Sequence, residues 1–231
     1  MISETDLSRP AADVLADALA RVPTPTAAAM RRTGIFRRWS DGQVVLEAGT
    51  IAPGALLLLR GRLRLVATSD RGDEVLFRWF VPGEFVGLVS ILGDQPLGTA
   101  AVADGDAEAA LFERRALLAH LRDDAAGALY FAALVSRSAS EIVELVVAQT
   151  TGSLRTRILI VLQRMARHES DDTDAEVRLS LSHQDLAHAV GASRQRVSVE
   201  LQELERSGHI RLGYRHLVLL RTGANPARGG T

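Results

Sequence analysis

The chain has 231 residues, of which 47% are apolar, so it can bury enough side chains for two modest domains. It contains no cysteine, which excludes disulfides, thiolate metal sites and cysteine-bound iron–sulfur clusters. The net charge is only -1, but residues 152–231 carry 12 arginines against 9 acidic residues, whereas residues 1–151 carry 15 against 19. Two halves of opposite sign indicate two different roles.

The N-terminal sequence MISETDLSRPAADVLADAL lacks the basic start and the apolar core of a signal peptide. No segment approaches the roughly 18 uninterrupted apolar residues that span a membrane. We therefore expect a cytoplasmic protein that does not bind a membrane. All 27 basic residues are arginine, which fits phosphate recognition but fits a GC-rich coding bias equally well.

Residues 1–33 are rich in alanine and predict a helical arm, interrupted by the segment VPTPT. Residues 34–113 show short β-type runs separated by glycines roughly every 5 to 11 residues, which is the turn spacing of an antiparallel barrel or sandwich. Within this region SDRGDE predicts a hairpin tip. Three arginines alternate with small or apolar residues and predict a strand with one solvated face: Arg60, Arg62 and Arg64.

From Arg114 onwards the apolar pattern becomes helical. A stripe with alternating spacings of three and four indicates a heptad seam that pairs two copies of the chain: Leu129, Ala132, Ser136, Ala139, Val143, Val146 and Thr150. The alternative is an ordinary amphipathic helix that packs on its own β-domain. The sequence TTGS then predicts a hinge, and Ser153 is expected to cap the next helix, which ends near His168.

The segment SHQDLAHAVGASRQRVSVELQELERSGHI carries the clearest motif. Ser182 and Asp185 form a start similar to a capping box, and Gly191 follows the first helix where a left-handed turn is needed. Ser193 caps a second helix, which Gly208 terminates. Its inner face is apolar, at Val197, Leu201 and Leu204. Two short helices joined by a tight turn predict a helix-turn-helix, and IRLGYRHLVLL predicts a β-hairpin wing.

Arg194, Gln195 and Arg196 lie in the first turn of the second helix, where the helix dipole disfavours positive charge. A partner rich in negative charge resolves this conflict. In a helix-turn-helix this end of the second helix enters the DNA major groove, where arginine can pair with guanine and glutamine with adenine. We therefore expect double-stranded DNA as the partner, rather than a merely solvated charged face.

From about residue 34 to residue 221 the chain resembles the CRP/FNR family of bacterial transcription regulators. The resemblance rests on ALLLLRGRLRLVATSDRGDEVLFRWFVPGEFVG, a long helix and the helix-turn-helix segment. It implies an α+β fold with an antiparallel, cyclic-nucleotide-binding-like β-roll, a dimerisation helix and a winged helix-turn-helix domain. The corresponding ranges are a helical arm at 1–33, the roll at 34–123, the dimerisation helix and hinge at 124–152, and the DNA-binding domain at 153–231.

The resemblance further implies a homodimer on a pseudo-palindromic operator. By position, the base-reading residues fall on Arg194, Gln195, Ser198 and Val199, and Ser193 and Arg196 belong to the same predicted DNA-binding surface. Phosphate contacts fall on His183, Gln184 and Arg215. Gln195 stands where glutamate is common and Val199 where arginine is common, which argues against a standard half-site. The acidic segment 169–176 could contact RNA polymerase, or it is simply a solvated loop.

The cyclic-nucleotide binders of this family use a glutamate for the ribose and an arginine for the phosphate. Here Gly87 is kept, but Leu88 and Gly98 replace these two residues, while Thr99 and Ala100 remain. Ile142 and Val143 fall where the family offers hydroxyls to adenine. Because burying a phosphate without a cation is costly, we do not expect cyclic AMP to bind in the usual way.

Two alternatives stay open for the roll. It binds a more apolar small-molecule effector, with Arg60, Arg62, Arg64 or Arg115 contacting an anionic part, or it is a scaffold without an effector. No cofactor is expected, and no histidine lies between residues 34 and 119 to bind haem or a cupin-type metal. Neither GxSxG nor GxxxxGK[ST] occurs, so we expect no enzyme. A pure protein-interaction module would differ by lacking salt-dependent DNA binding.

Overall fold

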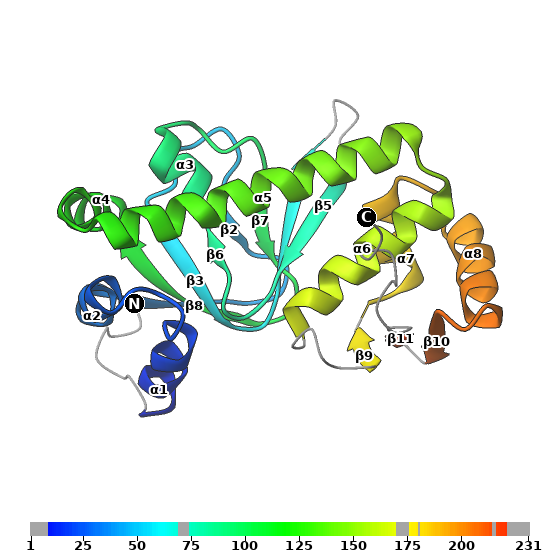
Figure 1. The fold of residues 1–231 in the computed structure, drawn as a ribbon, viewed down its shortest axis with the longest axis horizontal. Coiled ribbons are helices and arrows are strands. Elements are labelled where there is room, and N and C mark those ends of the chain that lie inside the picture. Colours follow the sequence, from blue (N-terminus) through cyan, green and yellow to red (C-terminus); the bar gives the residue numbers. More distant parts are fainter. Residues whose placement is uncertain (1–8, 69–73, 170–175, 180, 214–215, 221–231) are drawn as a thin grey trace, which may run out of the picture. The chain divides into compact units, whose positions relative to one another are not determined.

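The computed structural model describes residues 9–68, 74–169, 176–179, 181–213 and 216–220 (Figure 1). The hairpin tip at 69–73, most of the acidic segment at 170–175, Arg215 and residues 221–231 lie outside the described residues. Contacts divide the chain into two compact units, residues 1–140 and 141–231, and each is treated separately below.

The first unit begins with the two expected helices, α1 (Arg9–Ala18) and α2 (Thr24–Thr33). Proline in the first turn of α2 costs no hydrogen bond, because that turn has no intrahelical acceptor for its amide. Apolar side chains of both helices enter the core of the unit: Leu15, Leu19, Ala27 and Met30. The arm is therefore part of the folded unit.

Two four-stranded antiparallel sheets follow, in the orders β1-β8-β3-β6 and β2-β7-β4-β5. Their strands are β1 (Ile35–Trp39), β2 (Val44–Leu46), β3 (Gly54–Arg60), β4 (Leu63–Thr68), β5 (Glu74–Phe80), β6 (Phe85–Val86), β7 (Ala100–Ala103) and β8 (Ala107–Glu113). Strand β3 has six buried residues in succession, which shows that both of its faces are covered. The expected antiparallel β-domain is confirmed.

A short helix, α3 (Leu88–Gly93), interrupts the strands where the sequence indicated only β-runs and turns. It begins after Gly87, whose φ of 89° is accessible to glycine at little cost. Inside α3, the Ser90 hydroxyl accepts a hydrogen bond from the Ala52 amide at 2.9 Å, and Ile91 is buried. These two contacts fix α3 to the preceding loop and to the core.

Helix α4 (Arg114–Asp123) leads to the long helix α5 (Ala125–Thr151). Phe131 is fully buried and meets the Phe85 ring edge-on at 5.1 Å, so the first half of α5 packs on the roll. The six residues of the predicted heptad seam whose side chains are described are all exposed: Leu129, Ala132, Ser136, Ala139, Val143 and Val146. Helix α5 thus has one face that the described residues of its own chain leave open.

The second unit contains α6 (Leu154–Glu169), β9 (Glu176–Leu179), α7 (His183–Val190), α8 (Arg194–Arg206), β10 (Ile210–Gly213) and β11 (His216–Leu220). The three strands form an antiparallel sheet in the order β10-β11-β9. Fully buried side chains from three helices and the sheet form its core: Ile158, Leu162, Leu186, Val197, Leu201 and Ile210. This arrangement confirms the expected winged helix-turn-helix.

A polar network joins α2 to the start of α5. The buried Thr26 hydroxyl donates to Asp124, whose carboxylate also accepts from the Gly127 amide at 3.0 Å and contacts His120 at 3.1 Å. The Thr26 hydroxyl, then the Gly127 amide and His120, lower the pKa of Asp124, whereas burial acts in the opposite direction. A Cβ at residue 127 would lie 2.3 Å from the Thr26 hydroxyl, so this position requires glycine.

We predict that Thr26→Val lowers the melting temperature by a few degrees at pH 7, because the Asp124 carboxylate loses a donor while the side-chain shape is kept. A lowered pKa in the folded state contributes stability above the unfolded value of about 3.9 and loses it as the pH falls below that value. The difference in melting temperature between wild type and variant should therefore become smaller as the pH is lowered. Thermal unfolding followed by circular dichroism between pH 7 and pH 3 measures both effects.

Thr33→Val is the matched control, since this exposed hydroxyl of the same helix donates to the backbone oxygen of Ala29 and to no carboxylate among the described residues. A Thr26→Val difference that stays constant with pH would contradict the role given to the Asp124 charge.

Candidate nucleic-acid interface

Local capping interactions fix both helices of the helix-turn-helix. The Ser182 hydroxyl accepts from the Asp185 amide at 3.1 Å, and the Asp185 carboxylate accepts from the Ser182 amide at 3.0 Å, which completes the capping box. Gly191 ends α7 at a φ of 61°. The Ser193 hydroxyl then accepts from the Arg196 amide and begins α8. The sequence expectations for these four positions are confirmed.

Helix α8 has one deeply buried face. Val197, Leu201 and Leu204 are each 0% exposed and pack in the core of the second unit. At 100° per residue the opposite face of the helix is then directed to solvent. Gln195, Val199 and Gln202 follow one another on that face at spacings of four and three residues, and all three are exposed.

The tip of α8 carries positive charge that nothing in the described part of the chain neutralises. Arg194, Gln195 and Arg196 are exposed, and no carboxylate of the described residues forms an ion pair with either arginine. Arg194, Gln195, Ser198 and Val199 line one shallow, open hollow of the surface. The structure therefore gathers four predicted base-reading residues at a single place.

The first turn of α7 approaches this tip. His183 Nδ1 lies 2.9 Å from the Ser198 hydroxyl, and Gln184 Nε2 lies 2.7 Å from His188 Nε2. A second hollow is lined by residues of both helices and the wing, among them Ser182, His183, Gln184, Arg194, Gly213 and His216. His183 and Gln184 are thus neighbours of Arg194, as a shared nucleic-acid surface requires. Arg215 lies outside the described residues.

The wing is attached to α8 through its backbone. Glu205, in the last turns of α8, accepts a hydrogen bond from the Leu212 amide of β10 at 2.7 Å. Arg178 of β9 lies 3.3 Å from His216 Nδ1 of β11. These contacts hold the sheet and the second helix together as one surface.

Sequence reasoning missed Gln202 and the His183–Ser198 contact. Gln202 could have been found, since a helical period places it on the stripe of Gln195 and Val199. The contact joins residues 15 apart on two helices, and no local pattern indicates it.

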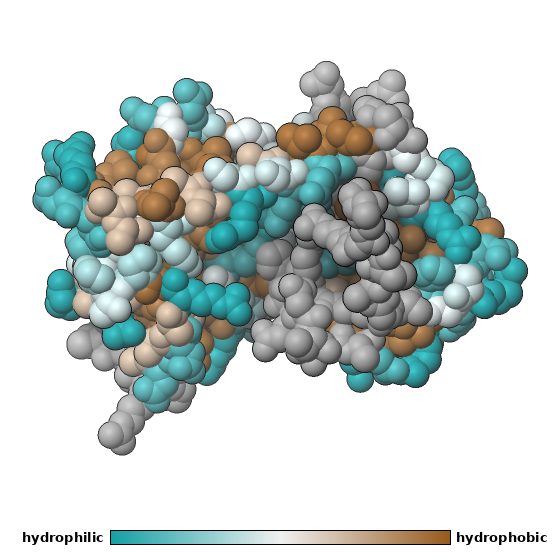
Figure 2. Space-filling view, in the orientation of Figure 1, coloured by the Kyte–Doolittle hydropathy of each residue, from teal (hydrophilic) through white to brown (hydrophobic). Residues whose placement is uncertain are grey.

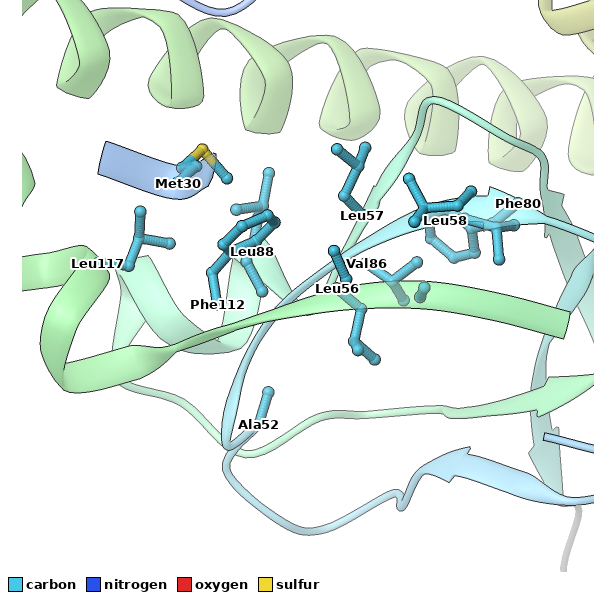
Figure 3. Close-up of a cluster of buried hydrophobic side chains, with 14 of the residues drawn as sticks. Met30, Ala52, Leu56, Leu57, Leu58, Phe80, Val86, Leu88, Phe112 and Leu117 are labelled. Atoms are coloured by element: carbon cyan, nitrogen blue, oxygen red, sulfur yellow. The ribbon is translucent and has the colours of Figure 1, made fainter. Parts of the chain in front are cut away.

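The residues predicted to form an effector pocket are glycines, alanine and aliphatic residues, apart from Thr99. Leu88 is 6% exposed and belongs to the same buried cluster as Met30, Phe112 and Leu117 (Figure 3). Gly98 is exposed, and a Cβ built there would meet nothing within 4 Å. Thr99 and Ala100 are half-buried. Ile142 and Val143 belong to the second unit, and both are exposed.

The single strand predicted through Arg60, Arg62 and Arg64 is wrong, because Arg60 ends β3, Arg62 lies in the turn after Gly61, whose φ is 76°, and Arg64 belongs to β4. Each of the three arginines contacts a carboxylate of a neighbouring strand or loop. Arg62 contacts Asp104 at 2.7 Å, and Asp104 also accepts from the Trp79 indole at 3.0 Å. Arg64 pairs with Glu74 at 3.1 Å and Arg60 with Glu108 at 3.7 Å. Arg115 is exposed. The described residues contain no cluster of three or more metal-ligating side chains and no helix long and apolar enough to cross a membrane.

Comparison with known proteins agrees with both halves of this description. Residues 36–124 match the cyclic nucleotide-binding domain, and residues 156–224 match the Crp-like helix-turn-helix domain. The transcriptional regulator SdrP of Thermus thermophilus is 28% identical over 182 residues, which is 78% of this chain and 86% of that protein. The cyclic AMP receptor protein of the same species is 28% identical over 177 residues, with 77% and 80% covered.

A solved structure gives the same result. The crystal structure of a transcriptional regulator of the CRP/FNR family from Thermus thermophilus matches with a TM-score of 0.60 and 27% identity, covering 80% of this chain and 93% of that one. Matches to both domains in this order, together with relatives that span most of the chain, determine the family. The chain belongs to the CRP/FNR family of DNA-binding transcription regulators.

Proposed function

We propose that the chain acts as a homodimer that binds a pseudo-palindromic operator, with the tip of α8 from each protomer in the major groove. The observation that supports this most strongly is the exposed pair Arg194 and Arg196 in the first turn of α8, without carboxylate partners among the described residues. A helix N-terminus rarely carries uncompensated cations unless anions approach it. DNA phosphates and guanine acceptors supply that compensation.

The chemistry of the tip fits base readout. Arg194 can donate two parallel hydrogen bonds to guanine, and Gln195 can pair with the acceptor and donor of adenine. His183 and Gln184 occupy the first turn of α7, where backbone amides and side chains suit a phosphate. His183 in addition holds the Ser198 hydroxyl at 2.9 Å, which limits the conformations of Ser198 in the groove.

Dimerisation through α5 is supported by its open face. Leu129 is 72% exposed, Val143 61% and Val146 56%, which is unusual for three large apolar side chains on one helix. Between them lie Ala132, Ser136 and Ala139, which are small enough for close approach of a second helix. Figure 2 shows apolar residues along part of the surface over α5. A parallel second copy of α5 would bury this seam.

We also infer that cyclic AMP is not bound in the family's usual way, although one relative is named a cyclic AMP receptor protein. Leu88 lies in the apolar core where a ribose-binding carboxylate would have to stand, and Gly98 offers no cation to a phosphate. Without that cation, transfer of the phosphate from water to the site is unfavourable. The carboxylate partners of Arg60, Arg62 and Arg64 favour the alternative of an effector-independent roll over an anionic effector at these residues.

We predict that Arg194→Ala weakens binding to the selected operator by roughly 10- to 100-fold and relaxes the preference at one base pair of each half-site. The operator is first selected from a random-sequence duplex pool with the purified protein, and affinities are then measured by fluorescence anisotropy at fixed salt. Arg122→Ala, which removes an exposed arginine of the first unit, should leave the base preference unchanged. An unaltered preference in Arg194→Ala would count against the groove assignment.

Ala139→Glu should convert the dimer to a monomer at micromolar concentration, because two carboxylates would face each other across the seam. Sedimentation equilibrium measures the mass of the free protein. The control Arg137→Glu introduces the same side chain at an exposed position outside the seam and should remain dimeric. A wild-type monomer, or a dimeric Ala139→Glu variant, would refute the seam.

Cyclic AMP at millimolar concentration should leave the melting temperature unchanged. A ligand present at 100 times its Kd would stabilise the folded state by about 2.7 kcal/mol, which corresponds to several degrees. Differential scanning fluorimetry detects such a shift, with the relative named cyclic AMP receptor protein as positive control. A rise of several degrees would show that the roll binds the nucleotide after all.

A further inference from the structure

The recognition face of α8 contains one apolar side chain that its own fold does not cover. Val199 is 58% exposed, and it is the single large apolar residue in the described part of 152–220 with such exposure. Its neighbours at the preceding and following turns, Gln195 and Gln202, are exposed carboxamides. The exposed valine side chain forms no hydrogen bonds with water, and it gains no free energy from burial in the protein core.

In this turn of α8, the methyl groups of Val199 project from the helix surface. Val197 and Leu201 point into the core and are 0% exposed. The Ser198 hydroxyl is held by His183 at 2.9 Å, so it is directed toward α7. Arg194, Gln195, Ser198 and Val199 form the walls of one open hollow, with Val199 as its apolar part.

We propose that Val199 reads a thymine through its 5-methyl group, and this inference rests on the proposed groove insertion of α8. The edges of the four base pairs in the major groove display hydrogen-bond donors and acceptors, and the thymine methyl is the apolar group among them. Valine can form no hydrogen bond but can exclude water from that methyl. The contact makes Val199 a specificity-determining residue at one position of each half-site.

The flanking carboxamides fit the same position. Gln195 and Gln202 stand one turn before and one turn after Val199 on the same face, so they face adjacent base pairs. Glutamine pairs with adenine through the N6 donor and the N7 acceptor. The stripe is therefore suited to a run of A·T pairs with a thymine methyl against Val199.

Replacement of each operator thymine by deoxyuridine tests the proposal, since it removes one methyl and keeps the base pairing. At one position the wild-type protein should lose about fourfold in affinity for one substituted half-site and about 15-fold for both, as expected for one buried methyl each. Other positions should change little. Fluorescence anisotropy with the selected duplex at fixed salt provides the affinities.

The variant Val199→Ala should bind thymine and deoxyuridine duplexes within about twofold of each other at that position. It is expected to fold, because the side chain is 58% exposed. Gln202→Ala, which alters the adjacent turn, should weaken binding to both duplexes but keep the full ratio of thymine to deoxyuridine affinities, so it separates the loss of a neighbouring contact from the loss of the methyl contact. The affinities of wild type and Val199→Ala for the thymine and deoxyuridine duplexes form a double-mutant cycle. This cycle gives the interaction energy between Val199 and the thymine methyl.

The outcomes separate the two proposals. Tight operator binding without any deoxyuridine effect would overturn the role of Val199 while the proposed function stands. A deoxyuridine effect that persists in Val199→Ala would assign the methyl to another residue and overturn the inference equally. If no sequence is selected from the pool, groove insertion itself is wrong and the inference fails with it.

Discussion

The structure of the second unit depends on the burial of one face of α8. Val197, Leu201 and Leu204 are fully removed from solvent, and each contributes roughly 1.5–3 kcal/mol on burial. Once these side chains occupy the core, the rotation of the helix about its axis is fixed. The side chains of Gln195 and Val199 are then exposed to solvent unless a partner covers them. In the proposed complex, specificity for DNA is a consequence of core packing, because the same residues that stabilise the unit determine which side chains project.

In helix α5, too, the packing of one face determines which side chains remain exposed on the other. Its first half is held by Phe131 and by the Thr26–Asp124 network, and this fixes which residues face away from the roll. The seam from Leu129 to Val146 is exposed in the single chain. Burial of its apolar surface against a second copy would lower the free energy. The small residues in its centre allow two helices to approach closely. In the proposed dimer, one face of α5 stabilises the fold of its own chain and the other face pairs with the second copy.

The elements that were predicted correctly are those whose determinants are local. The capping box at Ser182, the left-handed turn at Gly191 and the apolar spacing of α8 lie within one segment, so each could be recognised from neighbouring residues. Glycine spacing indicated an antiparallel β-domain, but it could not give the strand orders, which depend on register between distant segments. Helix α3 was not expected, because it is short and its position depends on the contact of Ser90 with Ala52.

The partners of the arginines in the roll could not be predicted from the local sequence either. These ion pairs also affect which ligands the roll can bind. The alternation of arginines suggested a single strand, but a turn at Gly61 separates β3 from β4, and the partners of Arg62 and Arg64, Asp104 and Glu74, come from other parts of the roll. A ligand shifts an equilibrium only by its difference in affinity for two states. Cations that already have carboxylate partners provide little of that difference to an anionic nucleotide. If pairing through α5 is required on the operator, occupancy follows the concentration of the protein itself, since two chains must associate before both tips of α8 can bind.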